Sequence, residues 1–479
     1  MNDLYDIYLQ KPLLLAKKFY SRIQKHRLVL FLLVYILYFS VGILLTKFIF
    51  AKHWLISGDD IASLFASPKS FNQFVSIYGS FSGQYRPLTY TLFNIFSLFG
   101  KDVVLMHLFT IALLSLVSLL IYDISKIING NGVVAILSGL FIPVSQIFFY
   151  DYYTISGLDN ILILLVALST VLLLLKYLNS KRIVYVYIAV LLSFLAIFIK
   201  ETYIIIPFMV FIFTVFCKTI KKTTKLRVLA LTALPTLIYV PIKLSFYRFV
   251  KGSPYTPNVT LSTAVNNLHW LGSWLLGVNN SVYMFMPNPL PQYYSWLIFG
   301  NFIILVLLMF FLYKNSYRLA LGIVLWLFMS IAPIIFFPRP LPYYLELSLI
   351  GIIIGFSFIK NSRTALLLVW TYLLLTVIQG NIIRDQWQRF SFIASANSVV
   401  TSLNNSIAPH LNSNVNGLCL NANNSGDSWA IQAGNSAKYF FPQLINIHTV
   451  SNPYAQCKYK NTIVVESTLD KYKFVKTIP

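Results

Sequence analysis

Eleven long apolar runs divide the first 380 residues of this chain, and they constrain its fold more than any other feature. A helix that spans a bilayer needs roughly 20 predominantly apolar residues. The runs lie near 28–50, 103–122, 133–150, 158–178, 183–199, 203–217, 228–247, 293–313, 319–337, 343–359 and 364–380. Those within 183–217 are short. The pattern predicts an all-α polytopic membrane protein with about eleven transmembrane helices.

The composition agrees with this class. Hydrophobic residues make up 57% of the 479 residues and charged residues 11%, and the mean hydropathy is +0.72, which excludes a water-soluble globule. Basic residues precede the first apolar run, as in a signal peptide. That run is too long for a signal peptide and lacks a small-residue cleavage site, so we interpret it as a retained anchor.

The lysines and arginines predict the orientation, because short loops rich in them stay in the cytoplasm. With eleven spans, one side receives the N-terminus and the basic turns 176–182, 218–227, 314–318 and 360–363. We therefore expect a cytoplasmic N-terminus. The net charge of +23 is then mainly a topology signal, and no nucleic-acid partner is predicted. The opposite side receives the loops 51–102 and 248–292 and the tail.

The tail loses the long apolar runs and gains asparagine and serine. Short β-like stretches lie at 417–420, 462–466 and 472–478, typical of a small mixed α/β domain. We predict a membrane domain over residues 1–384 and a C-terminal extracytoplasmic domain over 385–479. Cys419 and Cys457 are candidates for a disulfide in an oxidising compartment.

Charged residues gather at the predicted outer face, where burying a charge costs about 2.5–3.5 kcal/mol by insertion scales. They are Asp59-Asp60, Arg86, Lys200-Glu201 and Arg339. A guanidinium matches the oxygens of a phosphate, and an aspartate can take the proton of an attacking hydroxyl. Together these groups suit sugar transfer from a lipid-linked phosphate donor to a hydroxyl acceptor, with Asp59 or Asp60 as the base.

Each of these residues also has a structural interpretation. Asp59-Asp60 can cap a loop helix that begins at Ile61, and Arg86 can reach lipid head groups from the end of an interfacial helix that begins at Pro87. Lys200-Glu201 can be an ion pair that ends a helix. His107 is interpreted as a hydrogen-bonded core histidine.

The remaining outer residues are interpreted structurally. We expect Asp102 to start a helix, and Asp151 and Asp159 to lie in a solvated turn. The aromatic stripe in 88–99 is expected to lie on the bilayer. Two other functions stay open: a membrane transporter or lipid flippase with an outward-facing charged site, which internal repeats would favour, and a non-catalytic scaffold for the outer domain. We find no internal repeat.

The order of the outer motifs resembles the GT-C superfamily of polyprenyl-phosphate-sugar-dependent glycosyltransferases. In particular it is similar to the membrane part of the transmembrane protein O-mannosyltransferases that carry tetratricopeptide repeats, and to their repeat-free prokaryotic relatives. The series reads Asp59-Asp60, Tyr85-Arg86-Pro87-Leu88, His107, Lys200-Glu201, and Arg339 with Tyr343-Tyr344. The resemblance covers roughly residues 28 to 380.

The resemblance implies a GT-C-like fold with outer interfacial helices and a multi-pass protein of a prokaryotic cell membrane. It implies that Asp59 or Asp60 is the base, and that Arg86, Lys200 and Arg339 bind the donor phosphate. Glu201, His107 and Tyr85 would order the site. The implied partners are a polyprenyl-phosphate sugar donor, with mannose a candidate sugar, membrane lipid, and a protein or glycan acceptor.

Two points of this assignment stay open. A divalent cation held by Asp59, Asp60 and Glu201 is a candidate cofactor, and metal dependence stays open. The sequence departs from the family in lacking an asparagine shortly after His107, and in separating Arg339 from Tyr343 by Pro340-Leu341-Pro342. The role of Arg339 is therefore less well supported than that of Arg86.

Overall fold

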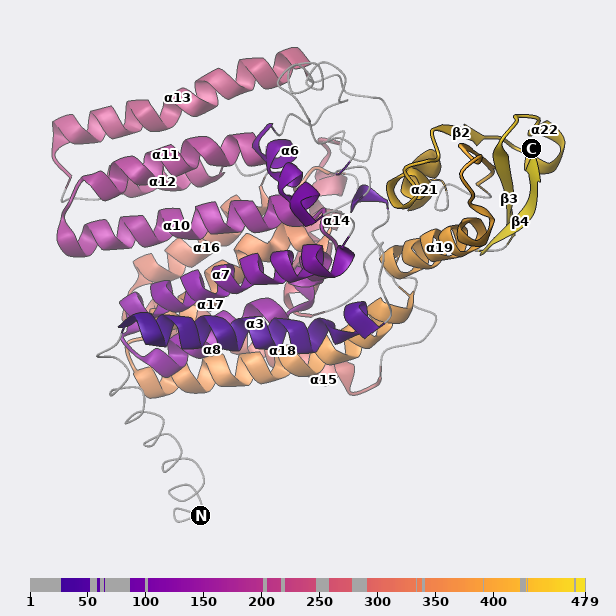
Figure 1. Ribbon diagram of the computed structural model, residues 1–479. Coiled ribbons are helices and arrows are strands. Elements are labelled where there is room, and N and C mark those ends of the chain that lie inside the picture. The colour runs from indigo at the N-terminus through magenta and orange to yellow at the C-terminus, as the bar shows by residue number, and fades with distance from the viewer. Residues whose placement is uncertain are drawn as a thin grey trace.

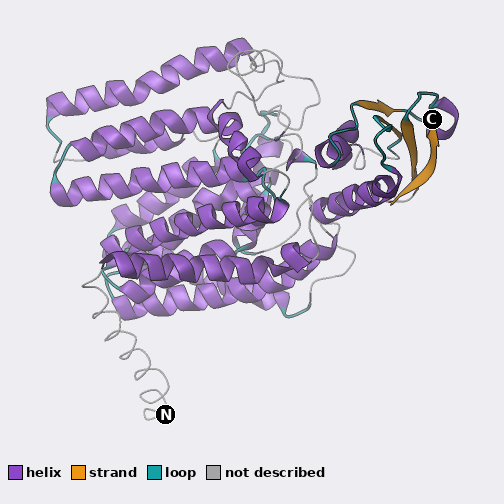
Figure 2. Cartoon of the chain, in the orientation of Figure 1, coloured by secondary structure: helices purple, strands orange, loops and turns teal. Residues whose placement is uncertain are grey.

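A computed structural model gives the fold. It describes residues 27–51, 58–60, 64, 87–99, 102–200, 205–216, 220–246, 258–277, 291–332, 334–337, 341–390, 392–422, 428, 430–468 and 471–478. The first part is a bundle of helices, and a smaller domain with a sheet follows it (Figures 1 and 2).

Each of the eleven predicted spans coincides with a helix. They are α3 (Arg27–Ala51), α7 (Val103–Asn129), α8 (Gly132–Val144), α10 (Leu158–Ser180), α11 (Val184–Ile199), α12 (Ile205–Phe216), α13 (Lys222–Phe246), α15 (Tyr294–Asn315), α16 (Tyr317–Ile331), α17 (Glu346–Ser357) and α18 (Ser362–Phe390). Within the described residues, five helices are long and apolar enough to span a membrane alone, or six when one bent pair is counted as a span. The apolar helices α11, α16 and Pro342–Ser357 are shorter.

The bent pair is α8 followed by η3 (Gln146–Phe148) and α9 (Phe149–Tyr153), with a 49° bend. Pro143 lies in the last turn of α8, and the helix ends at Ser145 in an extended conformation. Arg384 of α18 donates from Nη2 to the carbonyl of Pro143 at 3.2 Å, and its guanidinium lies 4.9 Å from the centre of the Phe149 ring. The buried arginine therefore satisfies a carbonyl at the break and fixes the direction of α9.

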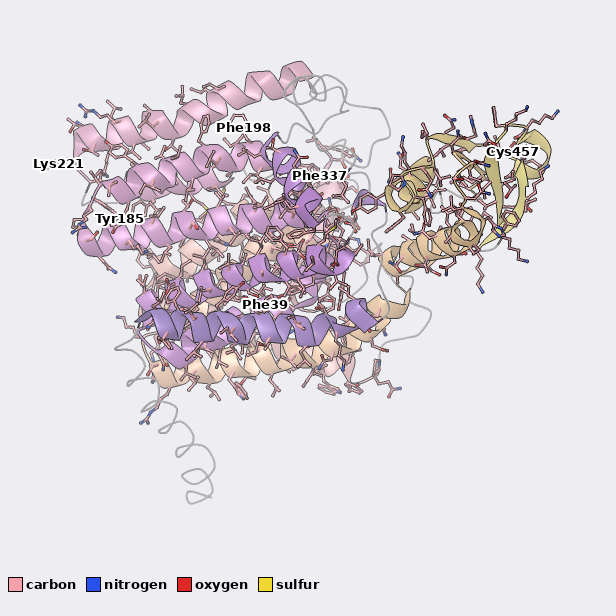
Figure 3. The ribbon with its side chains drawn as sticks, in the orientation of Figure 1. Phe39, Tyr185, Phe198, Lys221, Phe337 and Cys457 are labelled. Carbon is pink, nitrogen blue, oxygen red and sulfur yellow. A yellow bond between two sulfur atoms is a disulfide. The ribbon has the colours of Figure 1, made fainter. Side chains whose placement is uncertain are left out.

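Shorter helices cover one end of the bundle. They are α6 (Pro87–Phe93), η2 (Asn94–Phe99), α14 (Leu261–Leu275) and η5 (Pro342–Leu345). Pro87 begins α6 as predicted, and Asp102 caps α7 by accepting the backbone N–H of Leu105 at 3.0 Å. Figure 3 shows Tyr185 and Lys221 at the opposite end, and Phe337 at the end that faces the C-terminal domain with Cys457.

The C-terminal domain is a four-stranded sheet with helices. Its elements are α19 (Phe392–Ile407), η6 (Ala408–His410), β1 (Gly417–Leu420), η7 (Gln432–Gly434), α21 (Asn435–Phe440), β2 (Asn446–Thr449), α22 (Pro453–Gln456), β3 (Thr462–Thr468) and β4 (Lys471–Ile478). The strand order is β2-β1-β3-β4, with β1 parallel to both neighbours and β4 antiparallel to β3. Three strands match the predicted stretches, and β2 was not predicted.

The domain has an apolar core of its own, built from α19, β1, β3 and the segments between them. Cys419 and Cys457 form a disulfide on the sheet, as the sequence suggested. The helix α18 runs through residues 384 and 385 to Phe390, so the predicted boundary falls within a helix. The division of the chain at that point stays a prediction.

Candidate active site

The turn between α9 and α10 is the structural centre of the candidate site. The backbone N–H of Ser156 donates to Oδ1 of Asp60 at 2.8 Å, and the Ser156 hydroxyl lies 2.9 Å from that of Tyr150. Gly157 closes the turn, and a Cβ there would come within 2.6 Å of Oδ1 of Asp151. The close approach of these two residues therefore requires glycine.

The two acids Asp59 and Asp60 differ in their exposure to solvent. Asp59 is exposed, whereas Asp60 is 3% exposed. Burial raises the pKa of Asp60 to about 7, because a carboxylate loses hydration there; hydrogen bonds from Ser156 oppose this change, and the neighbouring charge of Asp59 adds to it. The predicted cap at Ile61 lies outside the described residues.

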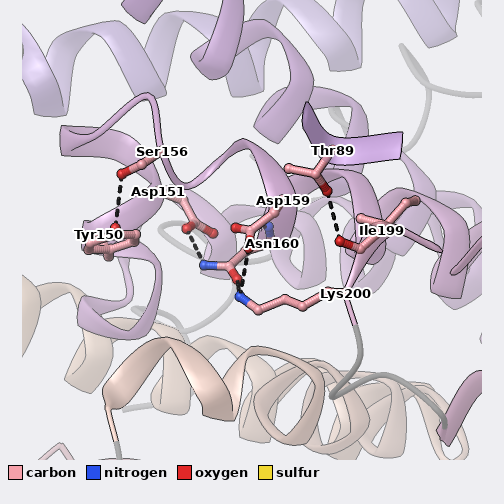
Figure 4. A network of polar contacts seen from close by, with 8 residues as sticks. All are labelled: Thr89, Tyr150, Asp151, Ser156, Asp159, Asn160, Ile199 and Lys200. Atoms are coloured by element: carbon pink, nitrogen blue, oxygen red, sulfur yellow. Dashed lines mark hydrogen bonds and ion pairs between the residues drawn. The ribbon is translucent and has the colours of Figure 1, made fainter. Parts of the chain in front are cut away.

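A second group of polar side chains surrounds Lys200, and Figure 4 shows it. The ammonium of Lys200 lies 3.2 Å from Oδ2 of Asp159 and donates to Oδ1 of Asn160. The amide of Asn160 in turn donates to Oδ1 of Asp151 at 2.8 Å. Lys200, Asp151, Asp159 and Asn160 are all buried, and these contacts offset part of the cost of burying their polar groups. A sequence of hydrogen bonds thus joins three segments of the bundle.

Aromatic and acidic residues from η5 and α17 complete this group. The ammonium of Lys200 lies 5.2 Å from the centre of the Tyr343 ring and 5.9 Å from that of Tyr344. Glu346 is fully buried and lies next to Asp151. Three carboxyl groups and one ammonium therefore share a buried space.

This arrangement corrects the interpretation of Asp151 and Asp159 as a solvated turn. Their exposed fractions are 0% and 6%, because α7, α10 and η5 pack around the turn. Sequence reasoning also gave no role to Asn160. The available signal was an Asp-Asn pair at the start of an apolar helix, where two polar side chains enter the bundle together.

His107 is in the core, as expected, but its predicted hydrogen bonds are not there. The side chain is fully buried in α7, and neither ring nitrogen has a hydrogen-bond partner within the described part of the chain. The hydroxyl of Thr110 donates to the backbone carbonyl of His107 at 2.8 Å.

Four predicted site residues lie outside the described residues: Tyr85, Arg86, Glu201 and Arg339. The segments next to both arginines reach the Lys200 group. The hydroxyl of Thr89, three residues after Arg86, donates to the carbonyl of Ile199 at 2.8 Å, directly before Lys200. After Arg339 the chain continues to Tyr343 and Tyr344, whose rings cover Lys200.

The segment before Arg339 is also anchored. Asn267 of α14 donates to the carbonyls of Ile335 and Phe337 at 2.8 and 2.7 Å. The Phe337 ring lies 6.0 Å from that of Tyr344. Helix α14 therefore connects the outer loop to the residues that precede Arg339.

The stripe in 88–99 is packed against protein more than the sequence suggested. Phe93 and Phe96 are 2% and 0% exposed and lie in a cluster with α7 and the α9–α10 turn, whereas Leu98 is 79% exposed. For the candidate cation site, the described residues contain no group of three or more His, Cys, Asp or Glu side chains placed to hold a metal ion.

Comparison with known proteins adds the following. The family model of dolichyl-phosphate-mannose-protein mannosyltransferases matches residues 87–244. This range contains His107, the α9–α10 turn and Lys200, but not Asp59, Asp60 or Arg339. No curated protein matches the chain significantly.

One similar solved structure is the Archaeoglobus fulgidus oligosaccharyltransferase, crystallised with an acceptor peptide containing the NVT sequon tethered by a disulfide bond. It is 10% identical, the match covers 91% of this chain and 65% of that chain, and the TM-score is 0.44. This chain thus spans less than two thirds of that protein. The family match and the apolar helices together support a membrane glycosyltransferase of the GT-C superfamily, in agreement with the motif series.

Proposed function

We propose that this protein transfers a single sugar from a polyprenyl-phosphate donor to a hydroxyl of a protein or glycan acceptor. The reaction would take place at the end of the bundle that faces the C-terminal domain. Mannose is the first sugar to test, because the matched family is described by it. We place the protein in a prokaryotic cell membrane, with the N-terminus in the cytoplasm and the C-terminal domain outside.

One observation carries this proposal: a single short turn connects a buried carboxylate to a buried ammonium. Ser156 binds Asp60, and three residues later Asp159 pairs with Lys200. Burying these charges is costly, and a fold that keeps them needs a use for them. A base and a charged group beside it are what sugar transfer from a phosphate requires.

In the proposed step, Asp60 or Asp59 accepts the proton of the acceptor hydroxyl. The hydroxyl oxygen forms a bond to the anomeric carbon, and the bond from that carbon to the phosphate oxygen breaks. The polyprenyl phosphate leaves with the bonding electron pair. A single displacement inverts the anomeric carbon, by analogy with inverting glycosidases.

Arg86 and Arg339 are proposed to bind the leaving phosphate, since guanidinium matches its oxygens in pairs. The ammonium of Lys200 already binds Asp159 and Asn160, and the rings of Tyr343 and Tyr344 lie over it. We therefore favour a role for Lys200 in ordering the site, together with Glu201, His107 and Tyr85.

The test is sugar release and transfer from radiolabelled polyprenyl-phosphate monosaccharides by the purified protein in nanodiscs. Asp59→Asn, Asp60→Asn and Arg86→Ala are compared with the wild type, with and without a chelator. We expect one aspartate variant to lose turnover while still binding donor, and Arg86→Ala to bind donor more weakly. If no donor is bound or consumed while the protein moves lipid or solute across a bilayer, the enzyme assignment fails in favour of a transporter or flippase.

A further inference from the structure

The described residues of the loop that carries Asp59 and Asp60, Gly58 to Asp60, are called the acid loop here, and they make hydrogen bonds to two other parts of the chain. The turn between α9 and α10 binds Asp60 through Ser156. From the other direction, the backbone N–H of Gly58 donates to the backbone carbonyl of Ala430 in the C-terminal domain at 3.1 Å. Gly58 is buried and has a φ of 51°, a left-handed conformation that glycine adopts readily. The residue directly before the two acids is thus bonded to the C-terminal domain.

An apolar contact joins the same two parts. Tyr439 and Phe440 of α21 pack against the cluster formed by Phe93, Phe96, Val103, Met106, Ile155 and Leu158. Leu64, four residues after Asp60, packs against this cluster as well. Helix α21 lies on the side of the C-terminal domain that faces the bundle (Figure 1).

The cluster continues directly into the candidate site. Ile155 and Leu158 lie on either side of Ser156, whose N–H binds Asp60, and Leu158 precedes Asp159, which pairs with Lys200. A movement of residues 430–440 away from the membrane part would therefore remove packing from the turn and a hydrogen bond from the acid loop together.

We propose that residues 430–440 of the C-terminal domain are a docking element that positions Asp59 and Asp60 on the membrane part. Tyr439 and Phe440 are its positioning residues. The inference rests on the proposed function. Undocking would let the acids move relative to the reacting hydroxyl, and misplacement by about 1 Å can cost on the order of a hundredfold in rate. Donor binding should change little, because Arg86 and Arg339, the residues proposed to contact the phosphate, belong neither to residues 430–440 nor to the acid pair.

The test uses the full chain in nanodiscs, with two measurements: donor turnover, and hydrogen exchange of the peptide that contains Gly58 and Asp60. We expect Phe440→Ala to lower kcat by about tenfold to a hundredfold, to leave the donor KM within about twofold, and to speed exchange at residues 58–60. Phe440→Leu, which keeps an apolar side chain, should restore most of both. The matched control is Tyr459→Ala, an aromatic truncation at a side chain that is 48% exposed and stacked on His448.

Unchanged kcat and unchanged exchange in Phe440→Ala would overturn the docking element. If that variant loses the Cys419–Cys457 disulfide or protease resistance, Phe99→Ala replaces it, since Phe99 belongs to the receiving cluster and not to the C-terminal domain. Unchanged exchange and kcat there also overturn the inference. If the wild type consumes no donor, the proposed function fails, while the exchange measurement still decides whether docking holds the acid loop.

Discussion

The two ends of the bundle differ in their described charged side chains: near Lys221 several are exposed, whereas a group at the end that faces the C-terminal domain is buried. Lys181, Arg182, Lys222 and Arg363 are all exposed at the first end. Asp60, Asp151, Asp159, Lys200 and Glu346 are buried at the second. Exposed charges keep their hydration and cost little. Buried charges are costly unless paired, so the second end is where the fold keeps groups for a specific purpose.

The largest expected difference between the two ends is between substitutions of a buried lysine, Lys200, and an exposed one, Lys222. Lys200→Met removes the ammonium and leaves the carboxyl of Asp159 and the amide of Asn160 buried without it, so we expect a loss of about 3–5 kcal/mol in stability, together with loss of turnover. Thermal unfolding in detergent or nanodiscs measures the change. Lys222→Met at the exposed end should stay within about 0.5 kcal/mol of wild type. Equal effects of the two substitutions would remove the distinction between the ends.

A second comparison is between acids at the end that faces the C-terminal domain. Asp60→Asn should lower turnover by about a hundredfold or more, the usual contribution of a general base, if Asp60 rather than Asp59 takes the proton. Asp102→Asn is the matched control, because Asp102 caps α7 at an exposed position and asparagine caps equally well. Full activity in Asp60→Asn and a loss in Asp59→Asn would transfer the role of base to the exposed acid.

The pH dependence of turnover also tests whether Asp60 is the base. With a pKa of about 7, Asp60 binds a proton below that value, so turnover should rise about tenfold per pH unit up to near pH 7 and then level off. The stability of the fold changes with pH in the opposite direction. The pKa is 3.8 without the fold, so the native state binds the extra proton between about pH 4 and 7, and stability should fall as the pH rises through that window. A turnover profile flat from pH 5 to 8 would contradict Asp60 as the base.

The smallest expected effect is that of Ser156→Ala. The backbone N–H that binds Asp60 remains, and only the hydroxyl contact with Tyr150 and its share in lowering the pKa of Asp60 are lost. The midpoint of the turnover profile should therefore move upward by about one pH unit, because a hydrogen bond to an ionised carboxylate contributes about 1.5 kcal/mol or more and one pKa unit corresponds to about 1.4 kcal/mol. A downward shift would mean that the hydroxyl acts on the acid in another way.

Much of the helical architecture was predictable because hydropathy is a property of contiguous residues. All eleven apolar runs coincide with helices, and the segments 417–420, 462–466 and 472–478 lie in strands. Pro87 and Asp102 began helices for local reasons, a fixed φ and a capping carboxylate. The strand β2 was missed because its four residues, Asn446–Thr449, show no long alternation and gain their place by pairing with β1.

The candidate site was predictable only in part. The motif series singled out Asp60 and Lys200, which the structure describes as buried and hydrogen-bonded, but not Asp151, Asp159, Asn160 or Glu346 as members of the same group. A short polar stretch between two apolar runs has the same local pattern whether it is solvated or buried. Its burial depends on what packs over it, here η5 with Tyr343 and Tyr344.

The sequence by itself determined the class of this protein, the positions of its helices and the resemblance of its motif series, because each depends on residues that are close together in the chain. Only the tertiary structure decided which charges meet. Ser156 and Asp60 are 96 residues apart, and Lys200 and Asn160 are 40 apart. The same holds for Gly58 and Ala430, which join the acid loop to the C-terminal domain. Such contacts follow from the packing of whole helices and domains, and no local pattern encodes them.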